Sequence, residues 1–320
     1  MIASYALQIS RVKDIQRAYN MNQYFILAAV GLLAAAPVKA EAMEDATTEQ
    51  QWAHGVTAKG GWYDANKTCT DDYTGGTMGE YPNDPSGYGA KTDDNMCYAA
   101  SAANLLAWWQ NLYEPVPGVP QGVTDIWKTF VNNSTTDGGG NFTAAISWWF
   151  NGMTDRLTPL APFDGYYQQY TKGESVYDQE KGNTFVTRVL QPTCRVLVNA
   201  LQSGKGISLK LEKKGSFHSI TVWGVEYAND RLTKMWITDS DDDKHLETPQ
   251  ARLLEIDVDG TDGNYTVNFG TDSTYSIHTA YLLDPSISDT WGLTRAIPEP
   301  TSATLAVLAL SALGLRRKRR

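Results

Sequence analysis

The strongest periodic pattern in the chain lies between residues 96 and 112. Small and apolar side chains recur there at the spacing of one helix face. The preceding run Asp93-Asp94-Asn95 consists of residue types that cap helix N-termini. The pattern therefore predicts a helix over residues 96–112, with Cys97 in its first turn.

Two further helices are predicted after this one. The break Gly138-Gly139-Gly140 is followed by Asn141, a good capping residue, and then by apolar residues as far as Phe150. A helix over Asn141–Phe150 is expected from this order. The segment Thr184–Gln202 is interpreted as another helix.

Beyond Gly206 the pattern changes to short alternating or apolar runs bounded by turn residues, which is typical of strands. Residues 41–92 are rich in glycine and other turn residues, so a loop-dominated lead-in is expected there. Helices first and antiparallel strands afterwards predict an α+β fold. The predicted strands are Ile207–Leu211, Phe217–Tyr227, Leu232–Thr238, Arg252–Val258, Tyr265–Phe269 and Ser276–Leu282.

Two of these strands are separated by Asn229-Asp230, a plausible hairpin turn. Antiparallel pairing centred on this turn sets His218 opposite Asp241 and diagonal to Asp239 on the same face. Both carboxylates would then reach the imidazole.

Tryptophans are expected to serve packing. The same hairpin register sets Trp223 across from Trp236 on the other face, and a cross-strand aromatic pair would fix the register. The adjacent pairs Trp108-Trp109 and Trp148-Trp149 are interpreted as buried packing residues, although a carbohydrate-binding surface is an alternative.

Composition limits the possible functions. Of 320 residues, 42% are hydrophobic and 20% charged, enough for one large globular domain. Residues 41–300 hold 18 Lys+Arg against 35 Asp+Glu, a charge of −17, so nucleic acid is not expected as a partner. The chain contains no P-loop, GxGxxG or HExxH motif, and its three cysteines lack zinc-site spacing. No cofactor and no metal are therefore expected.

The N-terminal segment 1–40 has the features of an overcalled start followed by a signal peptide. From Met21 the chain runs through an apolar stretch, Phe25–Ala36, to the small-residue cleavage pattern Val38-Lys39-Ala40. The apolar stretch is shorter than the ~20 residues that span a bilayer. Export with maturation near Glu41 is expected.

The other end resembles a PEP-CTERM sorting signal, residues 297–320. Ile297-Pro298-Glu299-Pro300 precedes an apolar stretch, Ala303–Leu315, and a basic tail, Arg316–Arg320. The resemblance implies a Gram-negative bacterium, cleavage by an exosortase, transient membrane contact of the C-terminal helix, and delivery to the cell surface or exterior. A permanent C-terminal anchor is the alternative.

Candidate chemistry centres on Cys97. A thiol in the first turn of a helix is stabilised as thiolate by unpaired amides and the helix dipole. With His218 on a later strand and Asp239 or Asp241 on the next, the chain has the order of a papain-like cysteine protease. Cys97 would attack a peptide carbonyl, His218 would protonate the leaving amine, and an aspartate would orient the ring. A small buried cysteine is the alternative.

Four segments carry a family resemblance, over residues 60–245: Gly61-Trp62-Tyr63-Asp64-Ala65-Asn66-Lys67, Asp93-Asp94-Asn95-Met96-Cys97-Tyr98-Ala99-Ala100, Trp108-Trp109 and Thr238-Asp239-Ser240-Asp241. In this order they resemble the streptococcal immunoglobulin-G-degrading IdeS/Mac family. That resemblance implies a papain-like endopeptidase with immunoglobulin G as the suggested substrate.

The resemblance also implies roles. Cys97 matches the nucleophile, His218 the general acid/base, Asp239 its orienter and Asp241 a second functional aspartate. Lys67 matches a lysine of the oxyanion hole. From the residues alone, Lys67 is interpreted as an ordinary surface lysine. The segment between Lys67 and Cys97 carries an insertion, residues 71–91, relative to the streptococcal pattern.

Other ionisable residues receive simpler interpretations. Cys69 is hypothesised to bridge to Cys194, leaving Cys97 free. The aspartates at positions 239 and 241–243 lack the spacing of a calcium loop and are read as a solvated turn. His245, in a charged turn, and His278, in a strand without a nearby acid, are expected to be structural.

The predicted organisation is a lead-in, residues 41–59, then a papain-like cysteine protease domain, residues 60–290, then the sorting signal. The expected function is an exported cysteine endopeptidase acting on a protein substrate. Two alternatives stay open. One is a non-catalytic surface adhesin that binds glycan or protein on the same fold, and the other is a transglutaminase or amidase that transfers acyl groups.

Overall fold

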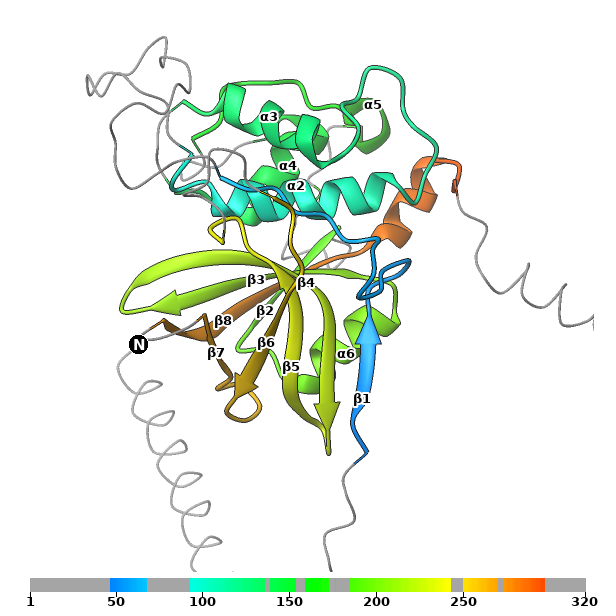
Figure 1. The fold of residues 1–320 in the computed structure, drawn as a ribbon. Coiled ribbons are helices and arrows are strands. Elements are labelled where there is room, and N and C mark those ends of the chain that lie inside the picture. The colour runs from blue at the N-terminus through cyan, green and yellow to red at the C-terminus, as the bar shows by residue number, and fades with distance from the viewer. Residues whose placement is uncertain are drawn as a thin grey trace, which may run out of the picture. The chain divides into compact units, whose positions relative to one another are not determined.

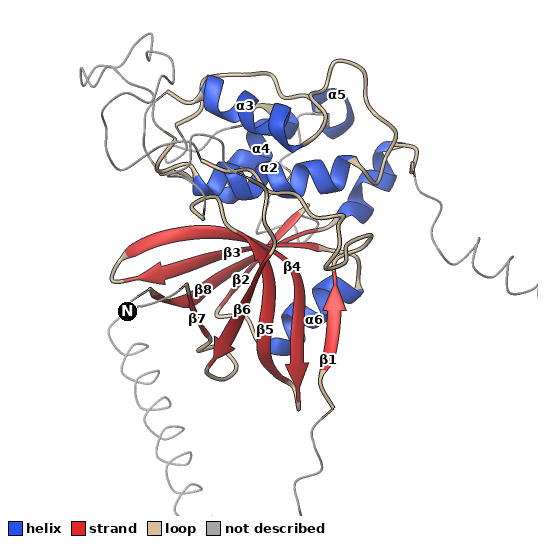
Figure 2. Cartoon of the chain, in the orientation of Figure 1, coloured by secondary structure: helices blue, strands red, loops and turns tan. Residues whose placement is uncertain are grey.

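Helices gather over one end of an antiparallel sheet in the computed structural model (Figure 1). The structure describes residues 47–67, 93–135, 139–153, 159–172, 176, 185–242, 250–269 and 273–296. All of these belong to one compact unit, Thr47–Arg320. The chain is therefore a mixed helix and sheet protein with its antiparallel sheet in the C-terminal part, as the α+β prediction stated (Figure 2).

The central helix is α2, Cys97–Gln110. Every residue from Tyr98 to Gln110 is buried, because α2 packs on two other helices on one side and on strands of the sheet on the other. A helix that is buried all round needs no polar face, which accounts for its alanine-rich and tryptophan-rich sequence. The predicted helix is confirmed, but its N-cap residue is Met96, whose side chain makes no capping hydrogen bond, so the N-cap position itself is not one of the three polar residues before it.

Around α2 lie α3, Val123–Asn133, α4, Phe142–Asn151, and the single turn α5, Gln168–Thr171. The predicted capping residue of α4 is confirmed, since Asn141 accepts a hydrogen bond from the Thr143 amide. The paired tryptophans of α2 and α4 are buried and pack with other aromatic rings, as expected.

Six strands form a ring of antiparallel pairings, because β5 pairs back with β4. All six predicted strands are present, with ends within two residues of prediction. Two short strands extend the sheet: β1, Glu49–Trp52, lies beside β4, and β2, Val186–Leu190, lies beside β8. The ring consists of β3, Gly206–Lys213, β4, Ser216–Ala228, β5, Arg231–Thr238, β6, Leu254–Asp259, β7, Thr266–Asn268, and β8, Thr274–Leu283.

The hairpin β4–β5 turns at Asn229-Asp230, as predicted. Both residues adopt the left-handed backbone conformation that two-residue hairpin turns require, with φ of 52° and 57°. The predicted register holds near the turn and again where Thr221 opposes Thr238. Between these points the register shifts twice.

The register shift removes the predicted pairing of Trp223 with Trp236, because Gly224 opposes Trp236 instead. Trp52 of β1 fills the space above Gly224, where an added Cβ would lie 2.7 Å from its ring. The Trp52 and Trp236 rings pack with centroids 4.5 Å apart. The aromatic pair that supports this part of the sheet is therefore formed with β1, which the sequence analysis had not identified as a strand.

The predicted helix Thr184–Gln202 is half wrong. Its first part is β2, and only Cys194–Gln202 is helical, as α6. Pro192 separates the two, and Thr193 caps the helix by accepting a hydrogen bond from the Val196 amide over 3.3 Å. The chain ends its described part with a 3₁₀ helix, Pro285–Trp291.

Three groups of predictions fall outside the described residues: the signal peptide, the insertion 71–91 and the sorting signal 297–320. Within the described ranges, no helix combines the length and the apolar character needed to cross a membrane.

Candidate active site

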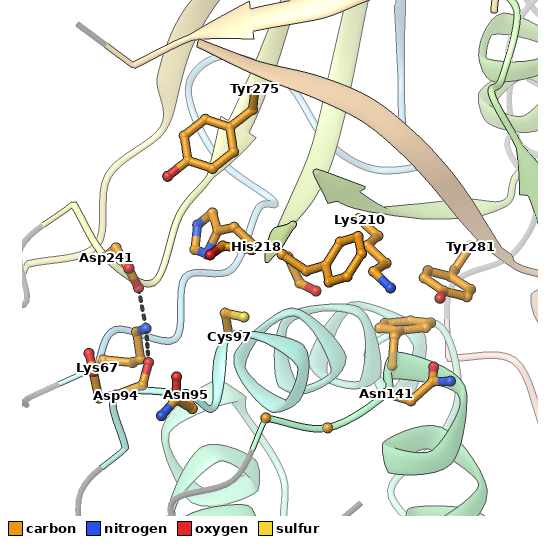
Figure 3. A pocket seen from close by; sticks show the side chains of 16 residues that line it. Lys67, Asp94, Asn95, Cys97, Asn141, Lys210, His218, Asp241, Tyr275 and Tyr281 are labelled. Carbon is orange, nitrogen blue, oxygen red and sulfur yellow. Dashed lines mark hydrogen bonds and ion pairs between the residues drawn. The ribbon is translucent and has the colours of Figure 1, made fainter. Parts of the chain in front are cut away.

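Cys97 is the first residue of α2 and lies at the edge of an open cleft (Figure 3). Its side chain is partly exposed, in contrast to the fully buried helix behind it. The first amides of a helix have no intrahelical acceptor, so the local field there favours an anion. The sequence prediction for the place of Cys97 is confirmed.

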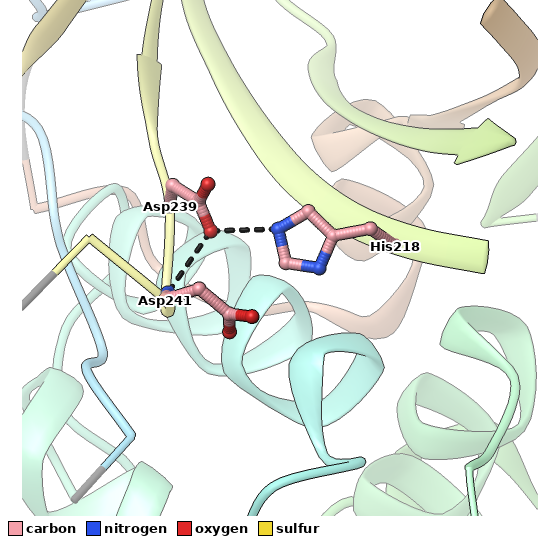
Figure 4. A group of neighbouring side chains, drawn as sticks. All are labelled: His218, Asp239 and Asp241. Carbon is pink, nitrogen blue, oxygen red and sulfur yellow. Dashed lines mark hydrogen bonds and ion pairs between the residues drawn. The ribbon is translucent and has the colours of Figure 1, made fainter. Parts of the chain in front are cut away.

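His218, which is partly buried, pairs with the buried Asp239 next to this thiol. The Nε2–H of His218 donates to Asp239 Oδ1 over 2.7 Å, and the Asp241 amide donates to the same oxygen over 3.0 Å (Figure 4). His218 also lies close enough to Cys97 for each residue to shift the pKa of the other. Because Nε2 is engaged by Asp239, Nδ1 is the ring nitrogen left for the thiol.

Cys97 and His218 shift each other's pKa. Burial raises the pKa of the Cys97 thiol, but the hydrogen bond and charge of His218, together with Lys67, bring it below its ordinary value. Burial lowers the pKa of His218, yet Asp239 and Cys97 hold it well above the usual range. Opposite shifts favour a thiolate paired with an imidazolium, the reactive form of a cysteine nucleophile.

Lys67 is buried, with 2% of its surface exposed. Its ammonium group donates to the Asp94 carbonyl oxygen and pairs with the Asp241 carboxylate. Burial lowers the pKa of Lys67, but Asp241 and Cys97 outweigh it and raise the pKa above its usual value. The interpretation of Lys67 as a surface lysine is therefore wrong. A backbone carbonyl oxygen and a carboxylate offset the free energy that burial of its ammonium group costs.

Asp239 and Asp241 have different partners in the structure, a point that the sequence left open. Asp239 contacts His218, whereas Asp241 contacts Lys67. Strand β5 ends at Thr238, so the predicted ladder pairing of His218 with Asp241 does not form. Asp239 follows that strand directly and reaches the imidazole from its end.

A buried polar network fixes α2 against the strands that carry these groups. Asn104 accepts a hydrogen bond from the Ala65 amide over 2.7 Å. Its amide nitrogen donates to Thr221 Oγ1 over 3.1 Å and to Thr238 Oγ1 over 3.2 Å. Nearby, Ser101 Oγ lies 2.8 Å from Ser208 Oγ. Sequence reasoning missed Asn104, although a polar residue within an apolar helix was the available signal.

The cleft has a volume of about 600 Å³ and is lined from both layers. The helix layer contributes Cys97 and the segment around Asn141, and the sheet contributes His218, Lys210 and Tyr275 (Figure 3).

A metal is the alternative use of this cluster. Ligand atoms of His218, Asp239 and Asp241 lie within 4.8 Å of one another. Each already has a partner, and the Lys67 ammonium beside Asp241 would repel a cation. The solvated turn predicted here is also wrong for Asp239, which is buried. The arrangement fits an ion-paired network better than a metal site.

Of the remaining candidates, His278 and Cys194 do not line the cleft. His278 Nε2 lies 3.8 Å from Glu212 Oε2, so the expectation of no nearby acid is wrong. Cys194 is a free, buried thiol, which does not support its predicted bond to Cys69. Cys69 and His245 fall outside the described residues.

Comparison with known proteins finds a distant relative that is named as a protease. The chain is 26% identical over 239 residues to the IgM protease of Streptococcus suis (strain P1/7). The match covers 60% of this chain and 21% of the relative, so the chain spans about a fifth of that protein's length. No family model matches the chain. The similarity indicates a distant relation to a protease.

Proposed function

We propose that this chain is a cysteine endopeptidase on a papain-like fold, with Cys97, His218 and Asp239 as its catalytic triad. The observation that carries the proposal is the His218–Asp239 pair beside a thiol at the start of α2. A buried structural cysteine would have its pKa raised, as Cys194 has, to about 11. The Cys97 pKa is lowered instead.

The reaction begins with the Cys97 thiolate. Sulfur attacks the scissile carbonyl carbon, and the carbonyl electrons move to oxygen. His218, as imidazolium, then gives its proton to the leaving amine as the C–N bond breaks, which leaves an acyl-enzyme. Water attacks the thioester, His218 accepts its proton, and the thiolate is released with the carboxylic acid product.

Asp239 assists by stabilising positive charge on His218, and Lys67 assists by stabilising the negative charge that develops on the substrate. Asp239 orients the His218 ring and stabilises its positive charge. The Lys67 ammonium, held by Asp241 and the Asp94 carbonyl, places positive charge beside the sulfur, where the oxyanion develops. The amide groups at the start of α2 favour the same negative charge.

We propose a protein as substrate, and the name of the relative suggests an immunoglobulin. We further propose that the protease domain spans residues 60–290, after the lead-in 41–59. Export by the signal peptide and exosortase processing of the C-terminal signal would place it at the cell surface or outside the cell. These proposals rest on the sequence features given above.

The test uses the full chain with a panel containing immunoglobulin G, immunoglobulin M and unrelated proteins, and fragments are measured by intact mass. Wild type and Cys194→Ala are expected to cleave the same bond, whereas Cys97→Ala is expected to be inactive. Cys194→Ala is the matched control because it removes a thiol far from the cleft. Incorporation of an added amine without cleavage would instead identify an acyl transferase, and an unreactive Cys97 with no cleavage would identify a binding module.

A further inference from the structure

Lys210 lies in the same cleft as the nucleophile but takes no part in the proposed chemistry. It is on β3, where it pairs with Ser219, the residue that follows His218. Its ammonium group points into the space between His218 and Tyr281 (Figure 3). A substrate residue close to the scissile bond would meet this group.

The Lys210 ammonium rests on an aromatic ring rather than on a carboxylate. Nζ lies 3.5 Å from the ring centroid of Phe217. Among the residues that the structure describes, Lys210 forms no salt bridge. A ring face attracts the cation but accepts no strong hydrogen bond, so the ammonium keeps donors for another ligand.

The charges around Lys210 also favour an anion. Burial and the nearby Arg188 lower the pKa of Lys210, and Glu212 only partly opposes them. The Glu212 carboxylate lies instead against His278, at 3.8 Å. Lys210 and Arg188 thus bring two positive charges together here, against the one negative charge of Glu212.

Aromatic side chains give the cationic region a defined shape. Phe217 is half exposed, which is unusual for so large an apolar residue, and it forms one wall. Phe142 and Tyr281 stack with centroids 5.4 Å apart and form another. Such walls exclude water from a bound side chain and strengthen its interaction with a charge.

We propose that Lys210 anchors a subsite that binds a carboxylate of the substrate beside the scissile bond, which makes acidic peptides the preferred substrates. The proposal rests on the endopeptidase function proposed above. The carboxylate is that of an aspartate or glutamate side chain, because an endopeptidase cleaves away from the chain ends. In either case the ammonium donates to its oxygens while the methylene groups pack between the rings.

The test is a positional library of acetylated, amidated octapeptides cleaved by the full chain, with products identified by mass spectrometry. At one position relative to the cleaved bond, glutamate is expected to be preferred over glutamine by about tenfold in kcat/KM. Lys210→Met should bring this ratio to about one, and Lys210→Glu should favour lysine there. Lys234→Met, a strand lysine paired with Glu255 outside the cleft, is the control and should keep the wild-type ratio.

A second arm measures binding and does not depend on turnover. Labelled peptides with free or amidated C-termini are titrated onto Cys97→Ala, with and without Lys210→Met, and binding is followed by anisotropy. Tighter binding of glutamate peptides, lost with Lys210→Met, supports the side-chain subsite. Binding that depends on the free C-terminus alone, with no preference for glutamate, would overturn it. An unchanged glutamate-to-glutamine ratio in Lys210→Met would overturn the subsite, whereas absence of any Cys97-dependent cleavage would overturn the endopeptidase function.

Discussion

The side-chain amide of Asn104 donates a hydrogen bond to Thr238 Oγ1 over 3.2 Å. Thr238 is the last residue of β5 and immediately precedes Asp239. This contact therefore joins α2, which carries Cys97, to the strand end that positions Asp239. Asn104 also binds Thr221, near His218, and Ala65, near Lys67. One buried side chain thus joins the segments that carry all four groups of the site.

Replacing this side chain should disturb the site as a whole. Asn104→Ala leaves Ala65, Thr221 and Thr238 without one partner each, and we expect a loss of about 1–3 kcal/mol in unfolding free energy. The rate of Cys97 alkylation by iodoacetamide should fall as well, because the thiol moves relative to His218. Denaturant melts and alkylation kinetics measure the two effects.

Ser101→Ala is the matched control for Asn104→Ala. Ser101 lies on the same helix and hydrogen-bonds only to strands β3 and β4. Ser101→Ala should therefore lower the free energy of unfolding, with a smaller change in the rate of Cys97 alkylation. Equal losses of Cys97 reactivity in both variants would show that Asn104 contributes only stability.

The pH dependence of kcat/KM should be bell-shaped and should narrow in Asp239→Asn. In the wild type, the acidic limb follows the lowered pKa of Cys97 and the alkaline limb follows the raised pKa of His218. Removing the Asp239 charge lowers the pKa of His218, so the alkaline limb moves to lower pH. With less positive charge on His218, the pKa of Cys97 increases and the acidic limb moves to higher pH. A profile of unchanged width would contradict the assignment of Asp239.

Much of the sheet could be predicted from the sequence, because alternation and turn residues are local signals. The turn at Asn229-Asp230 located β4 and β5 and brought His218 near Asp239. The register shifts that displace Trp223 could not be predicted, since they accompany a contact between Trp52 and Gly224, which lie far apart in the sequence.

The burial of Lys67 could not be predicted from local sequence patterns either. Its partner Asp241 lies far along the chain, and the two meet only because the Lys67 amide donates to the Ser240 carbonyl over 3.0 Å. Without that tertiary contact, burial of a lysine is not expected. The order of Cys97, His218 and Asp239 was predictable because each lies at a recognisable end of a helix or strand.

Alkylation should distinguish two of the cysteines by pH. At pH 6, iodoacetamide should label Cys97, whose pKa is lowered, and leave Cys194, whose burial helps raise its pKa to about 11. In denaturant both should react at alkaline pH. Peptide mapping by mass spectrometry reads the labelled sites. Labelling of Cys194 in the folded protein at pH 6 would contradict the structure.

Chelators should leave cleavage unchanged, whereas added Zn²⁺ should inhibit it. His218 and its neighbouring carboxylates are already paired, so EDTA has no required ion to remove. A thiolate and an imidazole are good zinc ligands, so Zn²⁺ would bind Cys97 and His218 together. Loss of activity in EDTA that Ca²⁺ or Zn²⁺ restores would identify a metal site instead.

The ion pair between Lys67 and Asp241 should be tested from both sides. Lys67→Met removes the positive charge beside Cys97, and we expect kcat to fall by about 10²–10³-fold, as for loss of one oxyanion donor. The acidic limb of the pH profile should also move to higher pH, because Lys67 lowers the pKa of Cys97 in the wild type. Lys59→Met, an exposed lysine earlier in the chain, is the control.

Asp241→Asn keeps the Lys67 charge but loosens its position, so it should reduce kcat less than Lys67→Met and leave the acidic limb closer to wild type. The double variant should resemble Lys67→Met alone, because Asp241 acts through the lysine. If the losses from the two single variants instead multiplied, Asp241 would have a separate contact with the substrate or with His218. Kinetics of the four proteins at several pH values decide between these outcomes.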